Sequence, residues 1–109
     1  MELLEKSYSD RHVISNVGEL NALSCHQLGK ELKQLIDSGQ RTIIIDCSRT
    51  TLVTSAGLRV IYEFGGKLEK TEGRLLLAEP SANVRMIFDL VDLQGDFPIL
   101  PTLMEALRY

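Results

Sequence analysis

The sequence contains no tryptophan, and only two cysteines and two histidines occur among its 109 residues. Cys25 and Cys47 are far apart and form no C-x-x-C pair, and His12 and His26 add no second pair of ligands. Cys25 and His26 are neighbours, but on a helix adjacent side chains diverge by about 100°. We therefore expect no metal site, and we favour a buried thiol beside an exposed imidazole over a Cys/His catalytic pair.

Long hydrophobic runs and runs of like charge are also missing. The longest apolar stretches, such as TIIID and LLLA, are far shorter than the roughly 20 residues that cross a bilayer. The first residues lack the basic and apolar parts of a signal peptide. The net charge of −3 is spread over the whole chain, so no basic run could follow a phosphate backbone. We expect a cytoplasmic protein that neither enters a membrane nor binds nucleic acid, and no feature suggests more than a monomer before a partner binds.

The usual catalytic motifs are absent as well. The sequence has no G-x-x-x-x-G-K-[ST] loop, no G-x-G-x-x-G after a predicted strand and no H-E-x-x-H. No acid/base pair stands beside a candidate nucleophile. These absences predict a protein that is not an enzyme and that holds no cofactor of its own.

The residues that are present indicate one α/β domain over residues 1–109. The chain is 44% hydrophobic and 25% charged, and no linker or repeat interrupts it. Short β-like runs at 3–8, 13–17, 42–46, 74–78 and 97–100 alternate with helical periodicity. This pattern predicts a mixed sheet of four or five strands with about four helices, and the β-branched run at 42–46 is expected to be the central strand.

Capping residues and glycines locate the expected helices. Ser24 with Gln27 fits a capping box for a first helix that Gly39 ends, and a second helix is expected at 56–72 with Gly73 as its stop. Gly65 and Gly66 interrupt this second helix, so either it bends there or another element packs against it. A third helix is expected to begin at Ser81, with its inward stripe formed by Val84, Ile87, Phe88 and Val91, and a fourth after Thr102 and Glu105.

The segment at 46–61 is the most informative, because hydroxyl side chains stand where an apolar run gives way to a helix. Ser55 is the predicted N-cap of that helix. A phosphate on Ser55 would face free backbone N–H groups and the positive end of the helix dipole. Local chemistry alone favours the cap over a phosphorylation site, since serine caps many helices.

Several ordered motifs then resemble the STAS family, in the form of its anti-sigma factor antagonists. The stretch TSAGLRVI at 54–61 is similar to the family motif D-S-[ST/A]-G-L, and GELN at 18–21 is similar to G-E-L-D. GRLLL at 73–77, followed by PSANVR at 80–85, is similar to a later section of the family, with Phe88 and Leu93 at its apolar positions. The resemblance covers nearly the whole chain and implies the STAS (SpoIIAA-like) fold.

The resemblance also implies a function. Such antagonists bind an anti-sigma factor that is also a serine kinase, which regulates transcription, and phosphorylation of the motif residue breaks the complex. That residue is Ser55 here, with Thr54 as the fallback acceptor, and a phosphatase would be a further partner. ATP would belong to the kinase. The residues expected to contact the partner are Glu19, Asn21, Thr54, Ser55, Ala56, Gly57 and Arg59.

Two departures leave an alternative open. Thr54 replaces the motif aspartate and Asn21 replaces the aspartate after G-E-L, so two carboxylates near the expected site are absent. Their absence favours a second hypothesis, a STAS subunit that stays unphosphorylated in a larger lipid-transport or sensory assembly. Arg59 has two interpretations as well: a solvated side chain, which is the commoner case, or a partner contact.

Overall fold

The computed structural model describes the backbone of residues 2–8 and 10–109 and the side chains from residue 10 onward. The strands are β1 (Glu2–Tyr8), β2 (Arg11–Leu20), β3 (Thr42–Asp46), β4 (Thr50–Val53), β5 (Arg74–Ala78) and β6 (Ile99–Leu100). The helices are α1 (Ala22–Asp37), α2 (Ser55–Lys70), α3 (Ala82–Leu90) and α4 (Leu103–Arg108), with a 3-10 turn η1 (Leu93–Gly95).

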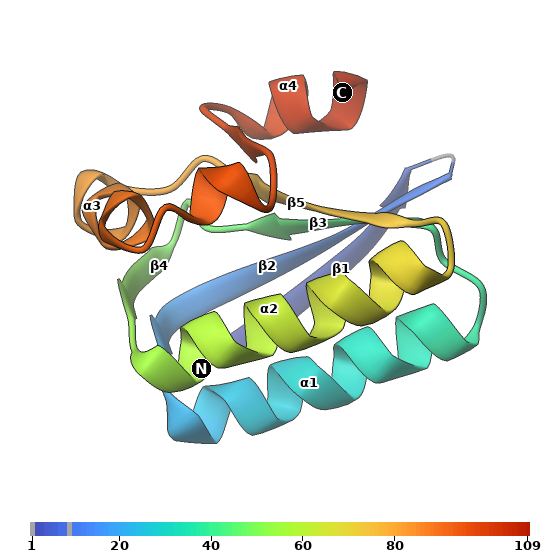
Figure 1. The fold of residues 1–109 in the computed structure, drawn as a ribbon, viewed down its shortest axis with the longest axis horizontal. Coiled ribbons are helices and arrows are strands. Elements are labelled where there is room, and N and C mark those ends of the chain that lie inside the picture. Colours follow the sequence, from blue (N-terminus) through green and yellow to red (C-terminus); the bar gives the residue numbers. More distant parts are fainter. Residues whose placement is uncertain (1, 9) are drawn as a thin grey trace.

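The sheet is mixed and runs in the order β1-β2-β3-β5-β6 (Figure 1). β1 pairs antiparallel with β2, and the other pairs are parallel. β3 stands in the middle with all five residues buried, so the predicted central strand and the α/β class with four helices are confirmed. β4 was not predicted; it pairs with the end of β2 beyond the point where β3 stops.

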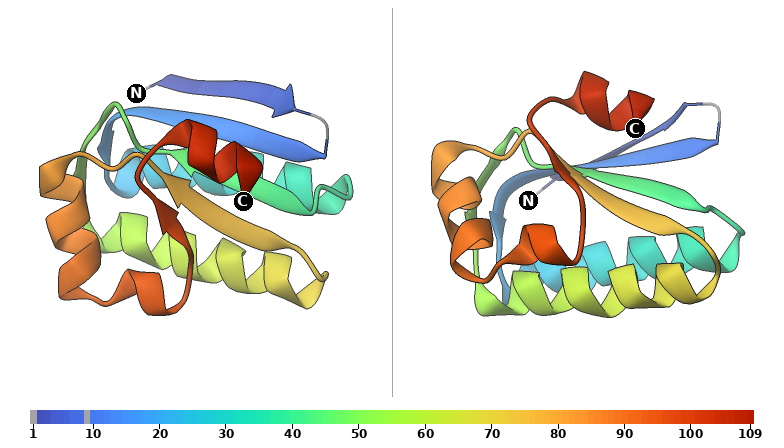
Figure 2. Two further views of the ribbon diagram at one scale, coloured as in Figure 1. Left: turned by 90° about the horizontal axis from the view of Figure 1, so that it is seen from above. Right: turned by 45° about the horizontal axis from the view of Figure 1, so that its top comes forward.

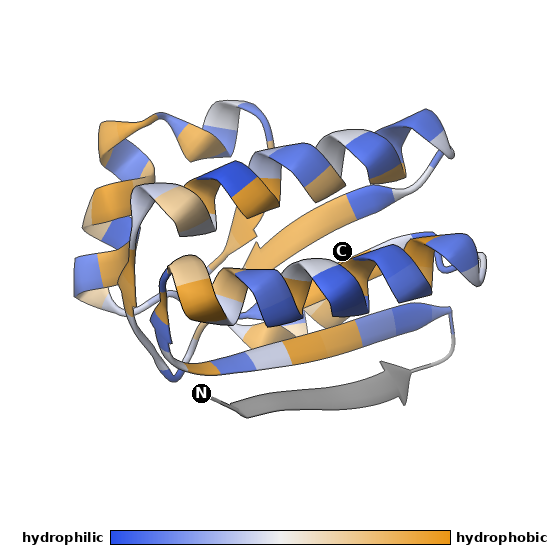
Figure 3. Ribbon diagram, turned by 90° about the horizontal axis from the view of Figure 1, so that it is seen from below, coloured by the Kyte–Doolittle hydropathy of each residue, from blue (hydrophilic) through white to orange (hydrophobic). Residues whose placement is uncertain are grey.

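Side chains alternate between two cores on opposite faces of the sheet. Ile43 and Ile45 of β3 join the larger core beneath α1 and α2, whereas Ile44 joins a smaller core with Ala106 of α4. Figure 2 shows α4 on one face of the sheet and α1 and α2 on the other. Figure 3 shows hydrophilic residues along the exposed surface of both long helices. Among the residues that the structure describes, every helix is too short or too polar to span a lipid bilayer.

The start of α1 differs from the prediction. Its N-cap is Asn21, whose side-chain oxygen accepts hydrogen bonds from the N–H groups of Leu23 and Ser24, both at 3.1 Å. Ser24 is the third residue of α1, and its hydroxyl oxygen accepts a hydrogen bond from the Asn21 N–H at 2.8 Å. The expected capping box at Ser24 and Gln27 was therefore wrong by one turn, because an Asn/Ser pair can make the same reciprocal bonds.

The glycines near the end of α2 have different roles. The helix ends at Lys70, and the left-handed residue that follows is Glu72 with φ 64°, not Gly73. Gly73 is required for a different reason, since a β-carbon there would overlap the carbonyl oxygen of Arg41. At Gly65 a β-carbon would overlap the ring of Phe97, whereas at Gly66 it would meet nothing within 4 Å. Of the two possibilities at this glycine pair, close packing at Gly65 is the one observed.

These contacts predict opposite effects for two neighbouring substitutions. Gly65→Ala should lower the free energy of unfolding by about 1–3 kcal/mol, because Phe97 must move to admit the methyl group. Gly66→Ala should raise it by about 0.5–1 kcal/mol, since alanine favours the helix. Urea unfolding of both variants beside the wild type measures the difference. Equal effects of the two changes would contradict the packing of Phe97 on Gly65.

Candidate functional site

The two helices that carry the predicted site begin at the same edge of the sheet. Thr54 follows β4 directly, and its N–H donates to the Leu20 carbonyl oxygen at 3.0 Å. The Thr54 hydroxyl donates to the same oxygen at 3.1 Å. Leu20 is the last residue of β2 and precedes the N-cap of α1. The structure thus brings the segment at 19–22 and the start of α2 together.

Gly57 makes this close approach possible. A β-carbon at this position would lie 2.9 Å from the carbonyl oxygen of Leu20 and 3.0 Å from Cγ1 of Val53. Few real contacts of a β-carbon are this short, so a larger residue would push α2 away from the ends of β2 and β4. Gly57 is itself buried. It shapes the edge and offers a partner no side chain.

The two neighbouring hydroxyls are in different environments. Thr54 is the N-cap of α2, with an extended backbone and an oxygen that accepts from the Gly57 N–H at 3.5 Å. Ser55 is the first helical residue and is exposed, and its side-chain hydroxyl makes no hydrogen bond within the described part of the chain. The predicted N-cap role of Ser55 was therefore wrong. Because the hydroxyl of Thr54 caps α2, the hydroxyl of Ser55 is not needed as a cap. It is therefore free to react or to contact another molecule.

The remaining predicted residues divide by exposure. Glu19 and Arg59 are exposed, and Arg59 forms no ion pair with any described residue. Asn21 and Ala56 are half-buried, and Asn21 is committed to capping α1. Ser24 also donates to the backbone oxygen of Glu19 at 2.8 Å, which holds the turn in place. The accessible functional groups of the predicted set are therefore the carboxylate of Glu19, the hydroxyl of Ser55 and the guanidinium of Arg59.

Three exposed apolar side chains near this edge were not predicted from the sequence. They are Leu52 on β4, which is 41% exposed, and Met86 and Leu90 on α3, which are 63% and 80% exposed. α3 packs beside β4. Met86 and Leu90 are four residues apart, a spacing that places them on one face of the helix. Val91, which was expected to point inward, is also 41% exposed, so the apolar stripe of α3 is wider than its buried part.

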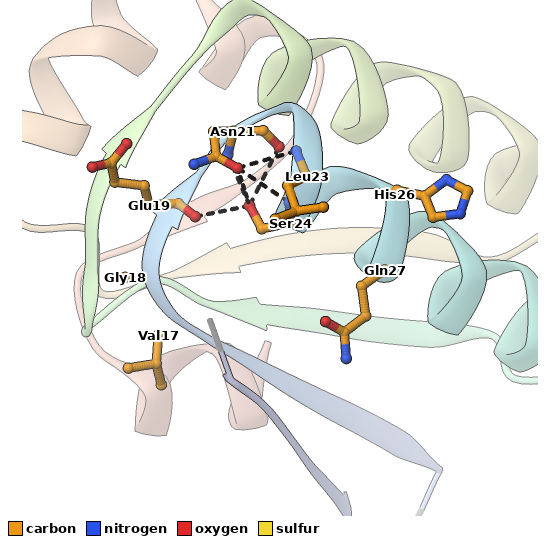
Figure 4. A pocket seen from close by; sticks show the side chains of 8 residues that line it. All are labelled: Val17, Gly18, Glu19, Asn21, Leu23, Ser24, His26 and Gln27. Atoms are coloured by element: carbon orange, nitrogen blue, oxygen red, sulfur yellow. Dashed lines mark hydrogen bonds between the residues drawn. The ribbon is translucent and has the colours of Figure 1, made fainter.

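A groove of about 760 Å³ lies on the other side of the same edge, along the first turn of α1 (Figure 4). Leu23, 85% exposed, and Glu19 are among its lining residues. Exposed apolar side chains rimmed by polar groups are typical of protein interfaces. The edge therefore carries the free hydroxyl of Ser55 together with exposed apolar side chains on the elements that meet there.

The cysteines are poor nucleophiles in this fold. Burial raises the pKa of the Cys47 thiol to about 12, and burial also raises the pKa of Cys25. Both thiols are therefore protonated at neutral pH, and the thiolate is the reactive form. In the ranges that the structure describes, no three His, Cys, Asp or Glu side chains are grouped so that they could hold a metal ion.

The division of roles between Thr54 and Ser55 predicts their contributions to stability. Thr54→Val should lower the free energy of unfolding by about 1–2 kcal/mol, because it removes the N-cap and the bond to Leu20. Thr54→Ser keeps both bonds and should cost less. Ser55→Ala should change stability by less than about 0.5 kcal/mol, as an exposed helical alanine does. Chemical unfolding of the three variants checks the assignment, which a costly Ser55→Ala would refute.

Comparison with known proteins adds to this geometry. Over 82 residues the chain is 33% identical to BtrV of Bordetella bronchiseptica, which carries the name of an anti-sigma factor antagonist; the match covers 75% of this chain and 71% of BtrV. The unphosphorylated form of the anti-sigma factor antagonist SpoIIAA superposes with a TM-score of 0.84 at 27% identity, covering 97% of this chain and 93% of that one. The phosphorylated form of Bacillus SpoIIAA gives a TM-score of 0.78 at 26% identity and covers 98% and 97% of the two chains.

The fold likeness extends further. An anti-sigma factor antagonist structure from Thermotoga maritima gives a TM-score of 0.91 at 22% identity, covering 97% of this chain and 92% of that one, and this supports the fold. The STAS domain family matches residues 5–106, nearly the whole sequence. This chain belongs to the STAS domain family.

Proposed function

We propose that this protein is an anti-sigma factor antagonist. It binds an anti-sigma factor that is also a serine kinase, and so regulates transcription in the cytoplasm. The kinase transfers the γ-phosphoryl group of its ATP to the Ser55 oxygen, releasing ADP, and the phosphorylated antagonist leaves the complex. The names of the similar proteins support the general role.

The observation that carries the proposal is the state of the Ser55 hydroxyl. It is exposed on the first residue of α2 and has no hydrogen bond to the described residues. Phosphorylation requires an accessible hydroxyl. Thr54, the fallback acceptor, is half-buried and uses its oxygen both as donor and as acceptor. Ser55 is therefore the acceptor we assign.

The surroundings of Ser55 explain why a phosphate would break a complex. Leu52, three residues before Ser55, and Leu23, in the first turn of α1, are both exposed at this edge. A partner that covers these side chains also removes water from Ser55. A phosphate adds a charge of about −1.5 to −2, and its desolvation opposes binding unless the partner supplies a matching positive group.

The replacement of the two motif aspartates by Asn21 and Thr54 does not disturb the structure of the proposed site. Their positions, Asn21 and Thr54, are the N-caps of α1 and α2. Asparagine caps a helix as well as aspartate does, and threonine nearly as well. The substitutions therefore keep the structural role and remove only negative charge. Less negative charge at the edge lowers the repulsion that a phosphate on Ser55 would meet.

The same loss of charge also favours one other function. A kinase that aligns its substrate through those carboxylates would not recognise this chain, which would then act as an unphosphorylated STAS subunit of a lipid-transport or sensory assembly. The mass of the protein purified from its native cell distinguishes the two functions. A species heavier by one phosphoryl group, together with a co-purified kinase, supports the antagonist, and a phosphatase would be the further partner that restores Ser55.

Substitution of Ser55 tests the switch. Ser55→Asp should weaken binding to the co-purified kinase by about tenfold or more, because it places a carboxylate in the desolvated contact. Ser55→Ala should bind as the wild type does and should stay bound when ATP is added. Both variants should keep the stability of the wild type, since Thr54 is the cap. Calorimetric titration with and without ATP measures the affinities, and release of the alanine variant by ATP would sink the assignment of Ser55.

Arg59 tests the extent of the surface. Arg59→Glu should weaken binding to the same partner by about tenfold without lowering the free energy of unfolding, because the side chain is exposed. Lys70→Glu, which reverses an exposed charge at the other end of α2, is the matched control and should leave the affinity unchanged. Unchanged affinity in Arg59→Glu would identify Arg59 as a solvated residue.

A further inference from the structure

We propose that Arg59 binds the phosphate of phosphorylated Ser55 within the same helix. Phosphorylation would then add a charge to the edge and also withdraw the Arg59 guanidinium from the partner. This inference rests on the proposed function for the modification of Ser55, but the pairing itself involves this chain alone.

Four polar side chains follow one another along one face of α2, and one of them, Arg59, has no oppositely charged neighbour paired with it among the described residues. Ser55, Arg59, Glu63 and Lys67 follow one another at intervals of four residues. Such residues are neighbours on a helix surface, with β-carbons about 5–6 Å apart. Glu63 and Lys67 form an ion pair at 3.2 Å. Arg59 forms no ion pair with a described residue, and the position one turn before it is the free hydroxyl of Ser55.

The fold readily closes pairs at this spacing. Lys33 with Asp37 in α1 is paired at 2.7 Å, and Arg85 with Asp89 in α3 at 3.1 Å. A pair with the negative group N-terminal to the positive one is the better orientation on a helix, and a phosphate on Ser55 before Arg59 has this order. The Glu63 and Lys67 pair has the same order and leaves Arg59 available.

The chemistry of the two groups suits a strong pair. A phosphate carries nearly two charges at neutral pH, and a guanidinium can donate two parallel hydrogen bonds to it. The phosphate would also stand at the N-terminal end of α2, where the helix dipole favours negative charge. The pair is closed within one helix, so no loop has to become ordered.

Other charged or titratable groups near this end of α2 could also change the pKa of the phosphate, so their influence must be separated from that of Arg59. Glu19 faces Leu52 across the pairing of β2 with β4, and its negative charge opposes a dianion. His26 lies on α1 and borders, with Val60, the groove between the two helices. Its imidazole is exposed on the surface of α1. The test therefore compares variants that share Glu19 and is repeated in a His26→Gln background.

The experiment places phosphoserine at position 55 by genetic incorporation, which needs no kinase, and titrates the purified protein by ³¹P NMR. The second pKa of the phosphate should be about 0.3 unit lower with Arg59 than in Arg59→Gln, as expected for a helical ion pair. Lys70→Gln, which removes an exposed charge from the far end of α2, should change it by less than about 0.1 unit. The Nε–Hε signal of Arg59 should shift on phosphorylation. An equal phosphate pKa in the wild type and in both variants, with an unmoved Arg59 signal, overturns the pairing.

A second measurement keeps the pairing separate from the proposed switch. If the phosphoserine protein loses its kinase partner while ³¹P NMR shows no effect of Arg59, the antagonist function stands and the pairing is wrong. If the pairing is seen but the phosphoserine protein binds the kinase as tightly as the unmodified protein does, the pairing stands and the switch is wrong.

Discussion

The carbonyl oxygen of Leu20 is the acceptor on which the candidate site depends. It receives both the N–H and the hydroxyl of Thr54 and so ties the end of β2 to the start of α2. Gly57 lies directly against the same oxygen. Because β2 also leads into the N-cap of α1, one acceptor fixes the relative position of two helix starts that are more than thirty residues apart in sequence. A surface formed by both helices needs such a link, since neither segment could hold it alone.

This link also separates two hydroxyls that are adjacent in sequence. The extended backbone of Thr54 turns its oxygen toward Leu20 and Gly57, and the helical backbone of Ser55 leaves the next oxygen in solvent. One hydroxyl therefore stabilises the fold, and the other is exposed and has no hydrogen bond within the described chain. A switch that is to change binding but not stability needs this separation, because phosphorylation of the capping residue would break the contact that builds the surface.

Exposed apolar side chains lie on the elements around Ser55. The exposed side chains of Leu23, Leu52, Met86 and Leu90 offer apolar area that a partner could cover. Burial of that area favours association, while a charge placed within it opposes association. Arg59, one turn further along α2, is the cation nearest in sequence to Ser55 that lacks a counter-ion within the described chain. In the proposed function, the edge combines an attractive contact with a group whose modification would reverse it.

Local patterns predicted much of this structure. The β-branched run of β3, the glycine after α1 and the alternation of strands with helices each depend on neighbouring residues, and the structure confirms them. The resemblance of the motifs to the STAS family was confirmed over residues 5–106. Which residue caps a helix was harder to predict. Asn21, Ser24, Thr54 and Ser55 can all cap, and only the path of the preceding strand decides which of them has the extended backbone.

The sequence by itself therefore determined the class of fold, the order of its elements apart from β4 and the segment that contains the proposed phosphorylation site, because periodicity and motif spacing are local properties. The tertiary structure decided the rest. β4 forms only because the end of β2 offers it a partner, and the apolar surface of α3 is visible only when its buried side is known. Thr54 and not Ser55 caps α2 because the acceptor it meets, the Leu20 carbonyl, is supplied by a distant strand.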